Sequence, residues 1–165
     1  MDWVDDISKA WRNEYPELDT RAMAPLIRLA RLGILIEAFQ QEVLEPFELT
    51  PGDYSVLAAL RRNGKPYALN PSQLYTRLQR SSGGMTKMLK RLEQRGLVNR
   101  ADNPDDRRGS VISLTRRGLS VQDRVFNAFL SASQSVLSPM TGKEQVEADR
   151  SLRILLEAFE AHRAA

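Results

Sequence analysis

The sequence of 165 residues has no cysteine and a single histidine, His162. Without cysteine, disulfides, thiol nucleophiles and thiolate metal sites are excluded. His162 lies in the last turn of an expected C-terminal helix, where it is a surface residue, so no Ser–His–Asp set can be drawn. The acidic residues Asp2, Asp5 and Asp6 fall in a first helical turn, where carboxylates suit the helix dipole better than a metal ion. We expect no catalytic residue, no metal site and no cofactor.

Long hydrophobic runs are also absent. No apolar stretch approaches the roughly 18 residues of a membrane span. The N-terminus, MDWVDDISKAW, is acidic and amphipathic, without the basic start and apolar stretch of a secretion signal. The chain is 42% apolar and 27% charged, which is typical of a soluble globular protein of about one domain. We expect a cytoplasmic protein without a membrane partner.

The net charge of +3 is distributed unevenly. Residues 77–108 hold nine Lys/Arg against four Asp/Glu, whereas the rest of the chain holds fifteen against seventeen. A basic segment on a slightly acidic body is typical of a protein that binds a polyanion. An ordinary solvated helix face is the alternative. RNA is disfavoured because the deep A-form major groove excludes a helix and no aromatic residue interleaves the basic side chains.

Helical periodicity and capping residues predict a mainly helical protein. Thr50, Thr115 and Thr141 stand where N-caps are expected, and Gly96 stands where a helix should end. A change to a period of two predicts a β-hairpin with strands at 97–102 and 109–115 around the turn formers NPDDRR. The expected helices cover residues 2–13, 20–47, 51–62, 71–78, 82–95, 116–138 and 144–163.

The basic segment contains a helix whose first turn is unusually small, SSGG followed by MTKMLKRLEQ. Two adjacent glycines weaken a helix by roughly 1 kcal/mol each. They are explained if the backbone must approach DNA closely, because a recognition helix enters the major groove with its N-terminus first. The alternative is that the glycines only loosen this turn and have no role in binding. Helical spacing turns Met85, Met88, Leu89 and Leu92 inward and places on the opposite face Ser82, Gly83, Thr86, Lys87, Lys90 and Arg91.

A short helix, a turn, this helix and a two-stranded wing together predict a winged helix-turn-helix. The wing carries Asp106, Arg107 and Arg108. Arginines on a narrow loop suit an adjacent minor groove, whose negative potential attracts guanidinium groups. An aspartate just before them can brace one arginine. A polar hairpin tip without a function is the alternative interpretation.

The run LIRLARLGILIEAF in the long second helix is apolar almost all the way round between Leu32 and Phe39. Such a helix must be covered on several sides, and a chain of this length has few elements to cover it. We expect a second subunit to do so.

The segment from about Thr50 to Thr115 resembles the MarR family of bacterial transcription regulators, through NPSQL, MTKMLKRLEQRGLV, and DRR followed by SLT. The resemblance implies that Arg108 enters a minor groove while Asp106 steadies it. It also implies a homodimer, formed by the first and last helices, on a near-palindromic operator. The implied organisation is N-terminal dimerisation helices at 1–48, a DNA-binding lobe at 49–115 and C-terminal dimerisation helices at 116–165, intertwined in one domain.

WRNEYPELD and ALRRNGKPYALNPSQL further resemble the urate-responsive, PecS-type branch of that family. That branch has an extra first helix with a tryptophan, matched by Trp11, and holds its ligand with an aspartate and an arginine. Those two positions align with Ser55 and Met88 here. The resemblance therefore implies an effector pocket with a more apolar lining, suited to an aromatic or phenolic ligand rather than urate.

The sequence thus predicts a DNA-binding transcriptional regulator, a ligand-responsive repressor acting as a homodimer. The alternative is a winged-helix module that binds protein without DNA, which should expose more apolar groups and fewer unpaired arginines.

Overall fold

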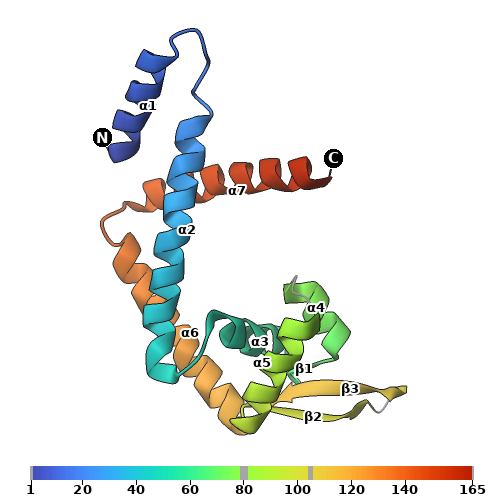
Figure 1. Ribbon diagram of the computed structural model, residues 1–165. Helices are drawn as coiled ribbons and strands as arrows, with labels where there is room; N and C mark the ends of the chain where they lie inside the picture. The colour runs from blue at the N-terminus through green and yellow to red at the C-terminus, as the bar shows by residue number, and fades with distance from the viewer. Residues whose placement is uncertain (1, 79–81, 104–105, 165) are drawn as a thin grey trace. The chain divides into compact units, whose positions relative to one another are not determined.

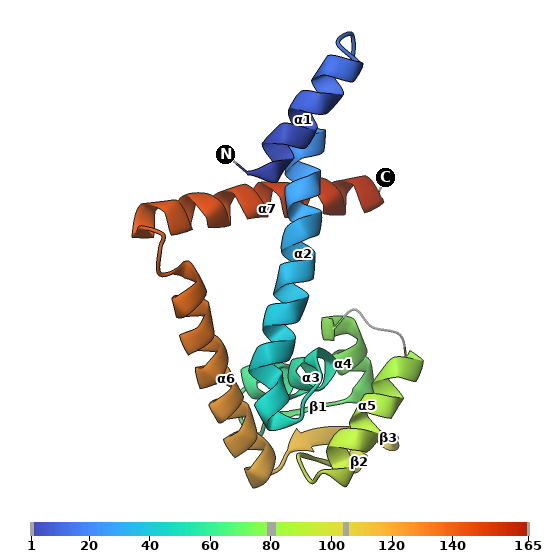
Figure 2. The ribbon, with the colours of Figure 1, turned by 60° about the vertical axis from the view of Figure 1, so that its left-hand side comes forward.

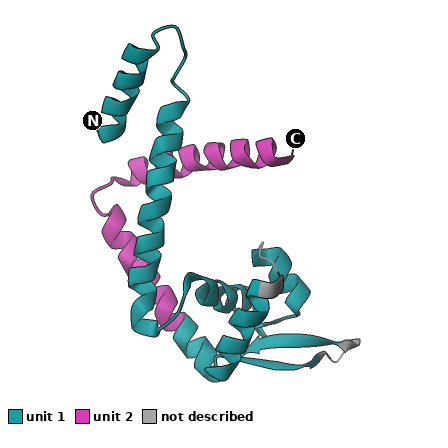
Figure 3. Ribbon diagram, in the orientation of Figure 1, with its two compact units in different colours: residues 1–122 teal, residues 123–165 magenta. Residues whose placement is uncertain are grey.

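The computed structural model describes residues 2–78, 82–103 and 106–164, and side chains over the same ranges except 82–83, 103 and 106–108. The fold is mainly helical with one small antiparallel sheet, as the sequence predicts. The chain divides into two compact units, residues 1–122 and 123–165 (Figure 3). Within the described residues, no helix combines the length and the apolar character needed to cross a membrane.

The first unit begins with α1 (Trp3–Glu14) and α2 (Met23–Leu44), which lie against each other near the start of α2 (Figures 1 and 2). A capping box opens α1: the Val4 amide donates to Asp2, and the Asp2 amide donates to Asp5. Arg28 of α2 donates to the same two carboxylates, at 2.9 and 2.5 Å. These acidic residues therefore cap α1 and also hold it to α2.

The long helix is shorter than the predicted span of 20–47. It begins at Met23 and ends at Leu44, where a 3-10 turn, η1 (Glu45–Phe47), replaces it. Pro46 accounts for the end, because proline has no N–H to donate and clashes with the preceding turn. Glu48 then adopts a left-handed backbone conformation with φ of 53°, which redirects the chain toward the next helix.

The DNA-binding lobe expected from the sequence contains α3 (Pro51–Arg62), α4 (Pro71–Leu78) and α5 (Ser82–Gln94). Thr50 caps α3 in a capping box with Asp53, and Asn70 caps α4 by accepting from the Gln73 amide at 2.8 Å. The predicted break at Gln79–Arg80 lies outside the described residues. The core of the lobe is apolar, and its fully buried side chains include Leu57, Leu60, Leu74, Met85, Leu92 and Ile112.

The sheet has the order β1-β3-β2, from β1 (Ala68–Leu69), β2 (Val98–Asn103) and β3 (Asp106–Leu114). β1 was not predicted, because two residues are too few to show a period; its pairing with Ile112 and Ser113 of β3 creates it. The predicted boundaries of the hairpin are also corrected. β3 begins at Asp106, which pairs with Asn103, so Arg107 and Arg108 belong to a strand rather than to the turn.

Two long helices complete the chain, α6 (Arg116–Leu137) and α7 (Gly142–Ala164). Thr115 caps α6 by accepting from the Gly118 amide at 2.9 Å, and its hydroxyl donates to the Gly96 carbonyl at 2.7 Å. Thr141 and Glu144 form the predicted capping box of α7. The start of α6, which belongs to the first unit, is therefore fixed to the turn between α5 and β2.

Candidate nucleic-acid interface

The helix α5 is held by burial on one side and by a glycine turn at its end. Met85, Met88, Leu89 and Leu92 are buried, which confirms the predicted inward face. Gly96 has φ of 65°, and the amides of Gly96 and Leu97 donate to the carbonyls of Glu93 and Leu92 at 2.8 and 2.9 Å. This pair of bonds satisfies the last carbonyls of the helix. The helix begins at Ser82, while the capping serine side chains predicted for it lie outside the described residues.

The opposite side of α5 carries exposed cations. Thr86, Lys87 and Lys90 are exposed, as predicted, and neither lysine has an ion-pair partner in the described part of the chain. Gly84 is exposed beside them, which leaves the backbone of the first turn accessible. An unpaired lysine at the surface keeps its whole charge for an external anion.

Arg91 differs from the two lysines. The sequence predicts it on the same cationic face, but the structure directs its guanidinium to α3, where it donates to Asp53 at 3.1 and 2.6 Å. It also donates to the Thr50 hydroxyl at 3.1 Å. The Asp53 side chain is only 1% exposed, so this carboxylate depends on Arg91 for charge compensation. Arg91 as a DNA contact stays a prediction, because 43% of its side chain is exposed beside this ion pair.

Sequence reasoning missed two residues in this region, Asp53 and Arg95. Arg95 follows α5 and donates to the Phe47 carbonyl at 3.0 Å, to the Glu48 carbonyl, and to the Glu48 carboxylate at 3.4 Å. The spacing Thr50-x-x-Asp53 could have signalled the capping role of Asp53. Nothing local signals either ion pair, because the partners lie 38 and 47 residues apart.

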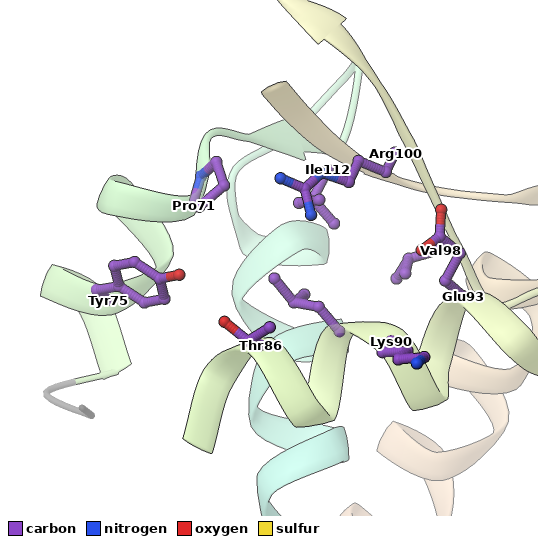
Figure 4. A pocket seen from close by; sticks show the side chains of 9 residues that line it. Pro71, Tyr75, Thr86, Lys90, Glu93, Val98, Arg100 and Ile112 are labelled. Atoms are coloured by element: carbon purple, nitrogen blue, oxygen red, sulfur yellow. The ribbon is translucent and has the colours of Figure 1, made fainter. Parts of the chain in front are cut away.

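A pocket of about 440 Å³ opens between α4, α5 and the sheet (Figure 4). Tyr75 from α4 and Thr86 and Lys90 from α5 line one side, and the guanidinium of Arg100 extends from β2 toward α4. Arg100 also donates to the Ser110 hydroxyl across the sheet at 3.1 Å. Lys90 and Arg100 give this hollow two cations against the single carboxylate of Glu93.

The wing residues predicted to contact DNA, Asp106, Arg107 and Arg108, occupy the start of β3. Their side chains, with that of Ser82, lie outside the described ones, and so does the exposure of Gly83. The backbone alone establishes that Arg107 and Arg108 are carried by a paired strand beside β2. A paired strand is a stiffer support than an open loop.

The three residues aligned with the urate-binding positions have other contacts in the single chain. Trp11 stacks on Tyr15, with ring centroids 5.7 Å apart, and is 41% exposed. The Ser55 hydroxyl donates to the Pro51 carbonyl at 2.7 Å. Met88 is buried, and a Cβ added at Gly52 would meet its sulfur at 2.5 Å. Met88 therefore packs against the first turn of α3.

The single chain does not bring these three residues together. α1 lies along the first half of α2, where Trp3 shares a hollow with Ile27 and Ile34. Ser55 and Met88 belong to helices that follow the other end of α2. A helix of 22 residues is about 33 Å long. Trp11 and the pair Ser55 and Met88 therefore belong to opposite ends of α2 within one chain.

Comparison with known proteins identifies a family and relatives that match between about four fifths and nearly all of the chain. The model of the MarR family matches residues 49–110. The HTH-type transcriptional regulator PecS of Dickeya dadantii is 36% identical over 159 residues, which cover 96% of this chain and 93% of that protein. The HTH-type transcriptional repressor MdtR of Bacillus subtilis is 32% identical over 136 residues, or 78% of this chain and 83% of MdtR.

A solved structure of a similar protein has the same fold and was determined as a complex with DNA. A mutant of MarR from E. coli, crystallised with operator DNA, superposes with a TM-score of 0.69 at 26% identity. The match covers 84% of this chain and 99% of the MarR chain.

Proposed function

Since the chain belongs to the MarR family of transcriptional regulators, we propose that it is a homodimeric repressor that binds a near-palindromic operator and releases it on binding a small molecule. Membership of this family supports DNA binding. It favours a regulator over the alternative, a winged-helix module that binds protein. The observation that carries the DNA contact is the exposed face of α5, where Lys87 and Lys90 have no ion-pair partner among the described residues and the opposite face is fully packed. We place the protein in the cytoplasm, because bacterial DNA lies there.

In this proposal α5 enters the major groove with its first turn leading. Gly84 lets the backbone approach the base edges, and Lys87 and Lys90 bind phosphates or guanine edges. The complex of mutant E. coli MarR with operator DNA supports DNA binding by this chain. The wing follows the backbone of the same half-site, with Arg108 in the minor groove and Asp106 bracing it. Ser82, Gly83, Thr86 and Arg107 complete the proposed interface.

A second copy of the chain supplies the cover that α2 lacks. Among the described residues of α2 only Leu44 is buried. Ile34 and Ile36 are 61% and 50% exposed, and α7 presents further large apolar side chains such as Ile154 and Phe159. Monomeric proteins rarely leave so much apolar surface in water. These helices are the proposed dimer interface, and the two lobes then present two copies of α5 to successive major grooves.

In this proposal the effector binds beside the first helix, α1. Trp11 of α1 and Tyr15, which directly follows α1, form an exposed aromatic stack. Met88 removes the cation that an anionic purine would need, so an aromatic or phenolic ligand suits the site better than urate. Such a ligand releases DNA only if it binds the DNA-incompetent state more tightly, and a hundredfold preference corresponds to about 2.7 kcal/mol.

The test measures DNA binding by two variants, Lys90→Ala and Arg108→Ala, at several salt concentrations. Loss of Lys90, a phosphate contact, should weaken binding to every duplex alike and reduce the slope of log Kd against log salt by about 1 per half-site. Arg108→Ala should weaken binding to the selected operator most, with a smaller effect where the flanking minor groove is wide. Equal binding by the wild type and Arg108→Ala at physiological salt would refute the wing assignment.

A further inference from the structure

Two arginines of the basic segment, Arg91 and Arg95, point back into the protein. We propose that they are positioning residues, which attach the recognition helix α5 to the junction between α2 and α3 and do not contact DNA. α5 then moves with the end of α2, so that changes along α2 reach the DNA-binding surface. The inference rests on the proposed function for the role of α5 in DNA binding.

The first attachment joins Arg91 to the first turn of α3. One oxygen of Asp53 accepts from the Arg91 Nε and Nη2 atoms, and the other accepts from the Thr50 amide at 3.0 Å and hydroxyl at 2.8 Å. Within the described residues, one cap and one arginine thus supply the donors to both oxygens of this buried carboxylate. The guanidinium uses both arms of its fork, because Nε donates to Asp53 while Nη2 donates to Asp53 and to the Thr50 hydroxyl.

The second attachment joins Arg95 to the turn that ends α2. Its guanidinium binds the carbonyls of Phe47 and Glu48, in the segment where η1 ends and the backbone of Glu48 turns left-handed. The Leu49 amide donates to the carbonyl of the buried Leu44 at 3.3 Å, so this turn is itself continuous with the end of α2. Arg95 therefore connects α5 to α2 through main-chain atoms.

The two attachments act together because of their spacing. Arg91 and Arg95 are one helical turn apart, and the Arg95 amide still donates to the Arg91 carbonyl at 3.1 Å. One bond would let α5 pivot about a point, whereas two bonds a turn apart also fix its direction. Between the lobes of a dimer, direction decides whether both copies of α5 reach their grooves.

The experiment compares Arg91→Lys and Asp53→Asn with the control Lys90→Gln on two duplexes. One duplex is selected from random sequence by the wild-type protein, and the other is an unselected duplex of equal length. Arg91→Lys keeps the charge and the exposed stem but loses the fork. It should weaken binding to the selected duplex about tenfold, the loss expected for broken hydrogen bonds to a charged group. The salt slope and the binding of the unselected duplex should remain those of the wild type.

Asp53→Asn separates positioning from simple electrostatics by the sign of its effect. Removing a negative charge near DNA should tighten the binding of both duplexes if Arg91 were a phosphate contact restrained by Asp53. The positioning role predicts weaker binding to the selected duplex instead. Wild-type or tighter binding by Asp53→Asn, or wild-type binding by Arg91→Lys, overturns the inference.

Hydrogen exchange in the absence of DNA tests the attachment of α5 separately from the proposed DNA contact. If Lys90→Gln binds both duplexes as the wild type does, the proposed interface on α5 is wrong, but the attachment is still tested by hydrogen exchange. Amides of residues 85–95 should exchange faster in Arg91→Lys and Asp53→Asn, and no faster in the double variant than in either one. Unchanged exchange in Arg91→Lys overturns the attachment, and circular dichroism confirms that each variant is folded.

Discussion

Gly118 lies at the start of α6, where the packing leaves no room for a side chain. A Cβ built on it would lie 1.9 Å from the Leu97 carbonyl oxygen and 2.9 Å from its carbon. Real Cβ contacts below 3.0 Å essentially do not occur, so Gly118→Ala must move α6 and the turn before β2 apart by more than an ångström. The obstacle is backbone, which cannot rotate away as a side chain can.

The expected magnitude follows from three terms. Forcing a methyl group into a packed site costs about 1–3 kcal/mol. The same movement breaks the Thr115 cap and its bond to Gly96, which costs about 1 kcal/mol. Alanine regains about 1 kcal/mol of helix propensity over glycine. Because the clash is with backbone, we expect a net loss of about 3 kcal/mol, near the upper limit of the first term.

The assay is thermal and urea unfolding at one fixed protein concentration, because the stability of a dimer depends on concentration. A loss of about 3 kcal/mol corresponds to roughly 6–12 °C in Tm for a chain of this length. Gly142→Ala is the matched control: it is also a helical glycine, but nothing lies within 4 Å of an added Cβ. It should be neutral or slightly stabilising. A Gly118→Ala protein as stable as the wild type contradicts the reasoning, and so does an equal loss in Gly142→Ala.

Three further predictions concern assembly, ligand and pH. Sedimentation at micromolar concentration should show a dimer, and a well-folded monomer there would disprove the role of α2. Urate should be a weak ligand if Met88 stands where urate-responsive regulators carry an arginine, as the sequence resemblance implies; DNA release at micromolar urate, with a change in Trp fluorescence, would show the opposite. A side-chain hydrogen bond from Arg28 lowers the pKa of Asp2 below its ordinary 3.8, so this contact stabilises the protein above that pH and is lost as the pH falls through the lowered value. The Tm difference between wild type and Arg28→Gln should therefore shrink below pH 3.8, and a constant difference would exclude the ion pair.

Much of the fold could be predicted because its signals are local. Thr50, Thr115 and Thr141 cap helices through atoms three residues away, and Gly96 ends α5 through its own backbone conformation. The inward face of α5 follows from spacing alone, because a packed helix buries one stripe. The wing could be predicted from a change of hydrophobic period to two and from a group of turn-forming residues.

The direction of Arg91 could not be predicted, and the reason is geometric. Arg91 is four residues from Lys87 and three from Met88, so helical spacing places it on the border between the exposed and the buried face. Its partner, Asp53, comes from a helix 38 residues earlier, and only the packing of α3 against α5 brings the two side chains to 2.6 Å. Local periodicity contains no information about that distance.

The same limit applies to β1 and Gly118. β1 is two residues long and exists because β3 offers a free edge beside it. Gly118 is one glycine near a helix start in the sequence, and its necessity comes from a carbonyl 21 positions earlier. The sequence by itself determined where helices begin and end and which face of each is apolar, since those depend on neighbours along the chain. Only the tertiary structure decided that Arg91 and Arg95 bond to α3 and to the end of α2 while Lys87 and Lys90 stay exposed, because that choice depends on neighbours in space.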